Sequence, residues 1–257
     1  MVAVVLMLVL PLSGCDASNG QPAVPTVTRQ ESLPADAVKA SPLDDPHPPI
    51  LHSDDYEYPV PVPGGINTAG AEDSPFITPD GNTMYYFFTP DVRVPPEKQL
   101  LDGATGIYVS HRSGGQWSEA QRVVLQEPGK LALDGAVAIH GDTMWFASAR
   151  EGNFRGVDMW TAELRDGVWT DWRNAGEQLN VVYQIGEVHF DGTSGTLYFH
   201  SDRPGGKGGY DIWVTTLGHA GWTEPVNLEA VNSADTDGWP FQSDDGSELW
   251  FTRTYMG

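Results

Sequence analysis

Short apolar runs separated by polar turns recur in the same order along most of this chain. Each copy begins with a polar turn containing Gly, or Asp and Gly, and continues into a run of alternating or continuous apolar residues, which predicts a β-strand. The four copies occupy residues 80–87, 140–146, 194–199 and 245–251. Taking Met84, Met144, Leu197 and Leu249 as markers, the spacings are 60, 53 and 52 residues. The chain therefore repeats with a period of about 52 residues.

A second pattern supports the same period. In three of the units a further strand-like run is followed, after a turn, by a tryptophan. The copies are 106–109 with Trp117, 158–161 with Trp169, and 211–214 with Trp222. Turn residues between the run and the tryptophan predict a β-hairpin whose second strand opens at the tryptophan. A shorter motif around Asn67, Asn180 and Asn232 precedes the units.

Together these patterns predict four short antiparallel strands per unit. A single sheet of this kind cannot bury its own faces, so neighbouring sheets must pack on one another. Packing around an axis produces a propeller, and the repeated aromatic residues then fill the spaces between the blades. The fold class predicted is all-β, a β-propeller of four-stranded antiparallel blades with about 52 residues per blade.

The repeats set the expected domain boundaries. The propeller is predicted over residues 51–257, with blades at 65–128, 129–180, 181–233 and a partial blade at 234–257, which makes the ring incomplete. Residues 16–50 are rich in Pro, Ala, Ser and Asp without apolar periodicity, so they are predicted to be an extended tether. The run 56–62 carries prolines and is at best an edge strand that helps to close the ring.

Composition agrees with a folded domain rich in turns. The chain has 257 residues, 40% of them hydrophobic, with 29 Gly and 20 Pro. Its formal net charge of −21 makes nucleic acid a poor partner, because binding to phosphates requires clustered Lys and Arg. The same charge favours cationic partners.

The single cysteine follows an apolar run that is too short to span a bilayer. Residues 2–12 form this run, and Leu12, Ser13, Gly14 and Cys15 come at its end. This pattern resembles the lipobox of bacterial lipoproteins. The resemblance implies that residues 1–15 are a signal peptide, that Cys15 carries the lipid, and that the protein lies outside the cytoplasm, in the periplasm or at the cell surface, touching the membrane only through this anchor. The alternative is that Cys15 is an incidental thiol.

One unit resembles a known propeller repeat in detail. The run 201–213, with its Ser-Asp-Arg-Pro-Gly-Gly start and Asp-Ile-Trp end, and its continuation at 222–228 are similar to the WD-like repeat of TolB-type bacterial envelope proteins. The resemblance covers about residues 65–253. It implies a binding or scaffold propeller without a shared catalytic apparatus, and partners that are an envelope protein or a peptide or carbohydrate ligand.

Acidic residues lie near the first strand of each unit, where that strand borders the centre of a propeller. They are Glu72, Asp73, Asp134, Glu187 and Asp237, and His189 lies in the same region of the third unit. Several carboxylates at one channel mouth would bind a cation or a basic peptide segment. The alternatives are solvated rim charges for the acids and a polar core position for His189.

Catalytic chemistry has weaker support in the sequence. A propeller glycoside hydrolase, which needs two or three carboxylates from different blades at one mouth, is the alternative function. No motif demands it, so no catalytic residue is assigned and the chain is interpreted as a binding module. No cofactor is expected, although calcium could have a structural role. Arg150 and Arg203, eight residues before Asp158 and Asp211, are expected to brace their turns.

Overall fold

The structure, a computed structural model, describes residues 27–45, 48–243 and 245–254, and its strands form antiparallel sheets. The first sheet consists of β1 (Ala71–Ile77), β2 (Thr83–Thr89), β3 (Gly106–Ser113), β4 (Gln116–Trp117) and β5 (Gln121–Arg122). The second consists of β6 (Ala132–His140), β7 (Thr143–Arg150), β8 (Asp158–Arg165) and β9 (Val168–Asn174). The third consists of β10 (Val188–Asp191), β11 (Thr196–Ser201), β12 (Asp211–Gly218), β13 (Gly221–Trp222) and β14 (Val226–Asn227). In the fourth unit, the described residues form β15 (Thr236–Gln242) and β16 (Leu249–Thr254).

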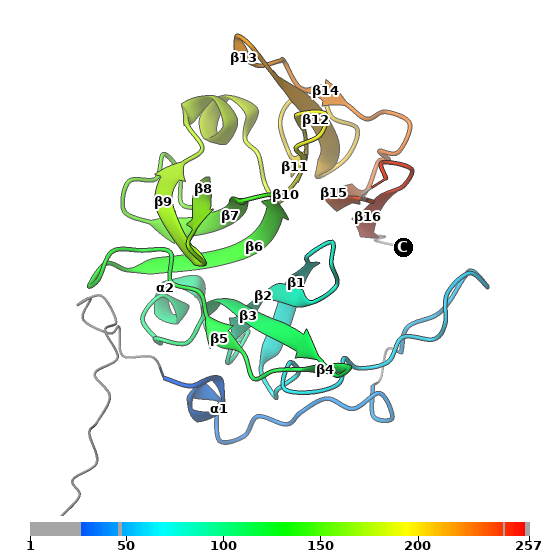
Figure 1. The fold of residues 1–257 in the computed structure, drawn as a ribbon. Helices are drawn as coiled ribbons and strands as arrows, with labels where there is room; N and C mark the ends of the chain where they lie inside the picture. The colour runs from blue at the N-terminus through cyan, green and yellow to red at the C-terminus, as the bar shows by residue number, and fades with distance from the viewer. Residues whose placement is uncertain (1–26, 46–47, 244, 255–257) are drawn as a thin grey trace, which may run out of the picture.

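These sheets are the blades of a β-propeller, which confirms the predicted fold class. The first strand of every unit lies innermost, and β6 contacts both β1 and β10 while β10 contacts β15. Figure 1 shows the blades arranged around these four inner strands. The chain passes outward through each blade and returns to the centre at the next one, as the 52-residue period requires.

Helices are few and short. They are α1 (Arg29–Ser32), α2 (Pro96–Gln99) and the π-helix η1 (Gln178–Tyr183). The long connection between β2 and β3 contains α2, and this insertion explains why the first repeat spans 60 residues instead of 52 or 53. Among the described residues, no helix is long and apolar enough to cross a membrane.

The blades pack through interdigitated aromatic and aliphatic side chains. One buried cluster between the first two blades contains Tyr85, Ile107, Met144 and Phe146. A second, between the second and third blades, contains Trp145, Leu197, Phe199 and Trp213. Consecutive residues of β7, Trp145 and Phe146, thus point to opposite neighbours, because side chains alternate between the two faces of a strand. Blade packing therefore follows directly from the period-two pattern of the sequence.

Three of the four inner strands change register at a β-bulge. The pairing shifts after Asp73 in β1, after Gly135 in β6 and after Gly238 in β15. At these bulges Ser74, Ala136 and Trp239 adopt φ values of 48°, 50° and 55°. A left-handed conformation is costly for residues other than glycine and recurs here at the same place in three blades. The bulges turn the backbone toward the centre of the propeller.

The segment before the propeller differs from the extended tether predicted for residues 16–50. In its described part, Thr28 caps α1 through a capping box with Glu31, and the Arg29 side chain is buried against the first blade. The run 56–62 forms no strand, although Tyr56 packs edge-on against Trp250 with 5.4 Å between the ring centroids. The residues around Arg29 pack on the first blade because Arg29 has charged and aromatic partners there, and the composition of residues 16–50 does not reveal these partners.

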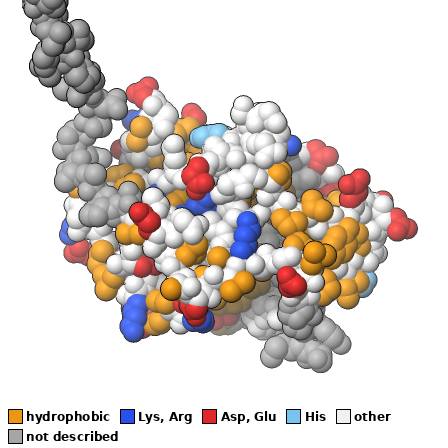
Figure 2. Space-filling view, turned by 90° about the horizontal axis from the view of Figure 1, so that it is seen from below, with side chains coloured by type: hydrophobic (Ala, Val, Ile, Leu, Met, Phe, Trp, Pro, Cys, Tyr) orange, Lys and Arg blue, Asp and Glu red, His pale blue; other side chains and the backbone are white. Residues whose placement is uncertain are grey.

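The surface charge is dispersed. Figure 2, a view from the side of the first blade, shows Asp and Glu side chains scattered over this face among hydrophobic and neutral groups, with isolated Lys and Arg between them. This face therefore offers no continuous basic area for phosphate binding.

Candidate functional site

The three bulges and the corresponding segment of the third blade surround a cavity of about 290 Å³ at the centre of the propeller, which we term the bulge pocket. Its lining includes the bulge residues Ser74, Ala136 and Trp239 and, from the third blade, Glu187, together with the residues that follow them on the inner strands. Glu187 occupies the equivalent position of the third blade, because Gly186 bonds through its N–H to the His200 carbonyl and Val188 pairs with Phe199. The pocket thus combines one side chain from the same position of every blade.

Glu187 is the chemically distinctive group of this pocket. Burial, and to a smaller extent the negative charge of Asp73, raises the pKa of Glu187 to about 7, while a hydrogen bond with the Trp239 side chain acts in the opposite direction. In the part of the chain that the structure describes, the ion pairs with Lys and Arg do not include Glu187. A half-buried carboxyl without a cation is held close to its protonation midpoint at neutral pH.

Two other predicted residues lie in the same pocket. Asp73 lines it from β1, is exposed, and accepts a hydrogen bond from the Ser74 N–H at 2.7 Å. His189 lines it from β10, and its ring packs edge-on against Phe241 with centroids 5.0 Å apart. His189 and Phe241 also line a second cavity, of about 450 Å³, at the carboxyl-terminal ends of the inner strands. The two cavities therefore follow one another along the centre of the propeller.

The remaining three predicted acids are not in the bulge pocket. Each lies one residue before the last strand pair that precedes the register shift. Each also contacts a polar or charged partner. Asp134 pairs with Arg150 at 2.6 Å, Asp237 pairs with Arg253 at 2.6 Å, and Glu72 accepts from the Thr68 hydroxyl at 2.6 Å and from Arg29. Burial by itself would raise the pKa of Asp237, but hydrogen bonds from Ser233 and Arg253 outweigh it and lower the pKa.

The expected ring of carboxylates is therefore divided by the structure. Glu187, Asp73 and His189 meet at one pocket, whereas Glu72, Asp134 and Asp237 serve as internal partners of arginines. The physical reason is strand position: Asp134 and Asp237 lie two residues before the bulge residues Ala136 and Trp239, whereas Glu187 lies at the equivalent of the bulge position. A displacement of two positions across a bulge changes which groups a side chain meets.

Sequence reasoning missed His200, which supports the pocket from behind. Its ring is buried between the third and fourth blades, 4.7 Å from the Tyr210 ring and 5.2 Å from the Trp239 ring. The Trp239 N–H donates to Nδ1 at 3.2 Å, and the Glu187 N–H lies 3.4 Å from Nε2. Burial lowers the pKa of His200 to about 4, against a smaller upward effect of the Asp202 charge, so the ring is neutral at pH 7.

Two glycines distant in the sequence leave the space for the His200 ring, so the sequence carried no signal for it. A Cβ atom on Gly186 would lie 2.2 Å from Nε2, and one on Gly238 would lie 3.1 Å from Nδ1. The imidazole thus fills the space that both glycines leave open. Only one ring nitrogen of a neutral imidazole can accept a hydrogen bond, so His200 fixes the backbone of one bulge at a time.

The raised pKa of Glu187 gives a prediction for stability. The ordinary pKa is 4.5 and the folded value is about 7, so between these pH values the folded state holds a proton that the unfolded chain releases, and stability falls as pH rises through this window. We expect Glu187→Gln to change the free energy of unfolding little at pH 4.5 and to raise it by about 2 kcal/mol relative to wild type at pH 8. Urea unfolding at both pH values measures this, with the exposed Glu97→Gln as control. Equal effects of Glu187→Gln at the two pH values would contradict it.

Metal binding and lipidation receive no structural support here. Over the described ranges, no group of three or more His, Cys, Asp or Glu side chains could hold a metal ion. Structural calcium therefore stays a prediction from the sequence. Cys15, the expected lipid attachment site, lies outside the described residues.

The fold and the bulge pocket define the chain as a β-propeller with a small central pocket. No protein-family model and no curated protein matches it. Among solved structures, a gluconolactonase from Xanthomonas campestris is similar at 14% sequence identity, with a TM-score of 0.43, over 71% of this chain and 54% of that one. This chain thus spans about half the length of that structure.

Proposed function

We propose that the chain is a binding propeller of the TolB-like type, held at the bacterial envelope by a lipid on Cys15, and that its bulge pocket receives a cationic group from an envelope protein or peptide. The observation that carries this proposal is the half-buried carboxyl of Glu187, which has no Lys or Arg partner among the described residues. Asp134 and Asp237 each pair with an arginine of this chain, while Glu187 faces the central pocket with no such partner among the described residues.

The rest of the pocket suits a cation as well. Asp73 adds a second negative charge to the pocket, and this charge contributes to the raised pKa of Glu187. Trp239 and Phe241, which are 39% and 43% exposed, offer aromatic faces. An ammonium or guanidinium group near such faces gains cation–π attraction in addition to its ion pair. The net charge of −21 would draw a basic segment toward the protein before contact.

Binding of this kind makes a pH-dependent prediction. A cation beside Glu187 favours the ionised carboxylate, so binding releases a proton and affinity rises as pH increases through about 7. The probes are two peptides, Ac-Gly-Lys-Gly-NH2 and its Gln analogue, titrated while indole fluorescence is recorded. At pH 8 we expect the Lys peptide to bind at least tenfold more tightly than the Gln peptide. This preference should be lost in Glu187→Gln and kept in Glu97→Gln. Equal binding of both peptides by wild type would refute a cation site.

A second function remains favoured by one specific observation. Burial raises the pKa of Glu187 to about 7, and Asp73 supplies a second carboxyl group in the same pocket; glycoside hydrolysis on a propeller needs two such carboxyl groups at one mouth. In that case an aryl glycoside would be turned over, and both Glu187→Gln and Asp73→Asn would abolish the reaction. Binding of the Lys peptide without hydrolysis of any aryl glycoside would favour the scaffold.

A further inference from the structure

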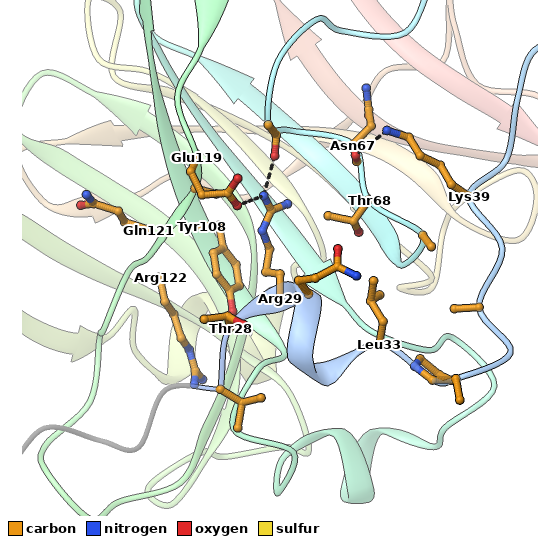
Figure 3. A pocket seen from close by; sticks show the side chains of 18 residues that line it. Thr28, Arg29, Leu33, Lys39, Asn67, Thr68, Tyr108, Glu119, Gln121 and Arg122 are labelled. Carbon is orange, nitrogen blue, oxygen red and sulfur yellow. Dashed lines mark hydrogen bonds and ion pairs between the residues drawn. The ribbon is translucent and has the colours of Figure 1, made fainter.

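Arg29 is buried against the first blade although it precedes the propeller by some 40 residues in the chain. Its Nη1 donates to the Ile66 carbonyl at 2.7 Å, and its Nη2 donates to the Gly65 carbonyl at 2.6 Å and to Glu119 at 2.9 Å. Glu72 lies 3.4 Å from Nη1. Figure 3 shows the guanidinium rising from α1 toward Glu119, with Tyr108 beside it. Two carboxylates and two carbonyls thus surround one buried cation.

Aromatic rings complete the enclosure. The guanidinium carbon lies 5.6 Å from the ring centroids of Tyr86 and Tyr108 and 5.5 Å from that of Phe88. These rings form the face of the first blade that points away from the second blade, with Leu33 packed against the same cluster. In Figure 1, α1 lies on this side of the sheet. The N-terminal segment therefore covers a blade face that would otherwise expose its aromatic residues.

The same arrangement recurs inside other blades. In the second blade, Arg150 pairs with Asp134, donates to the Leu125 carbonyl at 2.8 Å and lies over the rings of Phe146 and Trp160. In the fourth unit, Arg253 pairs with Asp237, donates to the Val231 carbonyl and lies over Phe251. Each arginine joins the carboxylate of an inner strand to a carbonyl of the segment that precedes it.

The first blade has no arginine of its own at this place. Glu72 is paired with Phe88 in the sheet as Asp134 is paired with Ser148. Two residues after Ser148 the second blade has Arg150, and the third blade has Arg203 at the equivalent position. Two residues after Phe88 the first blade has Pro90 instead. Arg29 takes the place of the missing side chain, with Tyr86 and Tyr108 in the positions of Phe146 and Trp160.

We infer that the first blade carries a guanidinium-binding site, formed by Glu72, Glu119, Tyr86, Tyr108 and the carbonyls of residues 65 and 66, and that Arg29 docks the N-terminal segment into it. The ligand class is an arginine side chain or another planar guanidinium, because its fork reaches two carbonyls and two carboxylates at once. Arg29 follows Cys15 by fourteen positions. Under the proposed lipid anchoring, chain geometry then holds the first blade within about 50 Å of the membrane.

Chemical rescue tests the site directly. In the full chain, Arg29→Ala is expected to lower Tm by on the order of 10 °C, because Glu72 loses its cation and the aromatic face is uncovered. Methylguanidinium at millimolar concentration should then raise the Tm of this variant in a saturable manner, and methylammonium should do so much less. Wild type should respond to neither. Arg93→Ala is the matched control, since Arg93 is an arginine with 65% side-chain exposure paired with Asp91.

Two outcomes would overturn the inference: a Tm of Arg29→Ala equal to that of Arg93→Ala, or a lowered Tm that methylguanidinium does not restore. A second measurement on wild type covers the case in which Arg29→Ala does not fold. Trypsin should cleave after Arg93 well before it cleaves after Arg29, because a docked side chain cannot enter the protease. Cleavage at both arginines with equal rates would also refute the site. None of these results depends on the bulge pocket, so they are independent of the proposed function.

Discussion

Replacing Gly186 by alanine is expected to destabilise the protein by roughly 2 to 4 kcal/mol, because the new methyl group would overlap a buried ring. The Cβ atom would lie 2.2 Å from Nε2 and 2.3 Å from Cδ2 of His200, and 3.0 Å from its carbonyl oxygen. The ring cannot swing away, since Tyr210 and Trp239 pack on it and Gly238 lies at its other edge. Either the inner strand or the imidazole must shift.

Chemical denaturation of wild type and Gly186→Ala measures this loss. Gly156→Ala is the control, since its Cβ would meet no atom within 4 Å and its φ is not in the left-handed region. The overlap also predicts coupling. In a His200→Ala background, the additional cost of Gly186→Ala should fall below about 1 kcal/mol, because the ring that it strikes is gone. A full cost in that background would show that the glycine serves the backbone and not the imidazole.

Arg150→Ala should cost about 3 to 5 kcal/mol of unfolding free energy, because it leaves the Asp134 carboxylate buried without its cation. Both side chains are almost fully enclosed, with 8% and 5% of their areas exposed. The truncation also removes the hydrogen bond to the Leu125 carbonyl and the guanidinium over Trp160, whose centroid lies 4.5 Å away. We expect thermal and urea unfolding to show the loss as a lower midpoint.

The matched control for this variant is Arg165→Ala. Arg165 also pairs with an aspartate, at 2.7 Å from Asp171, but with 65% and 49% side-chain exposure, so its loss should cost less than about 1 kcal/mol. Adding Asp134→Asn to Arg150→Ala should recover part of the stability, since a neutral amide is cheaper to bury than a lone charge. Similar costs for the two arginine variants would mean that the inner ion pair does not brace the blade.

Individual residues show how much of the bulge pocket the sequence pattern predicted. Glu187, Asp73 and His189 were predicted at the channel mouth, and the structure brings them to one pocket. Asp134 and Asp237 carry the same charge near the same strands, yet they bind arginines within their blades. The sequence could not separate the two groups, because the bulges that turn the chain at Ala136 and Trp239 leave no mark in the pattern of apolar residues.

The repeat alone predicts the blades. A 52-residue repeat of apolar runs and turns admits few ways of burying both faces of each sheet, so strand order and antiparallel pairing followed from local rules, while the short extra strands β5 and β14 did not. Only the tertiary structure decided which groups meet across the repeats. Arg29 takes the place that Arg150 has in the second blade, because the first blade has Pro90 at the equivalent position. His200 lies between Gly186 and Gly238, which belong to neighbouring blades. These contacts join residues distant in the chain, and they depend on bulge geometry and packing, which hydrophobic periodicity does not encode.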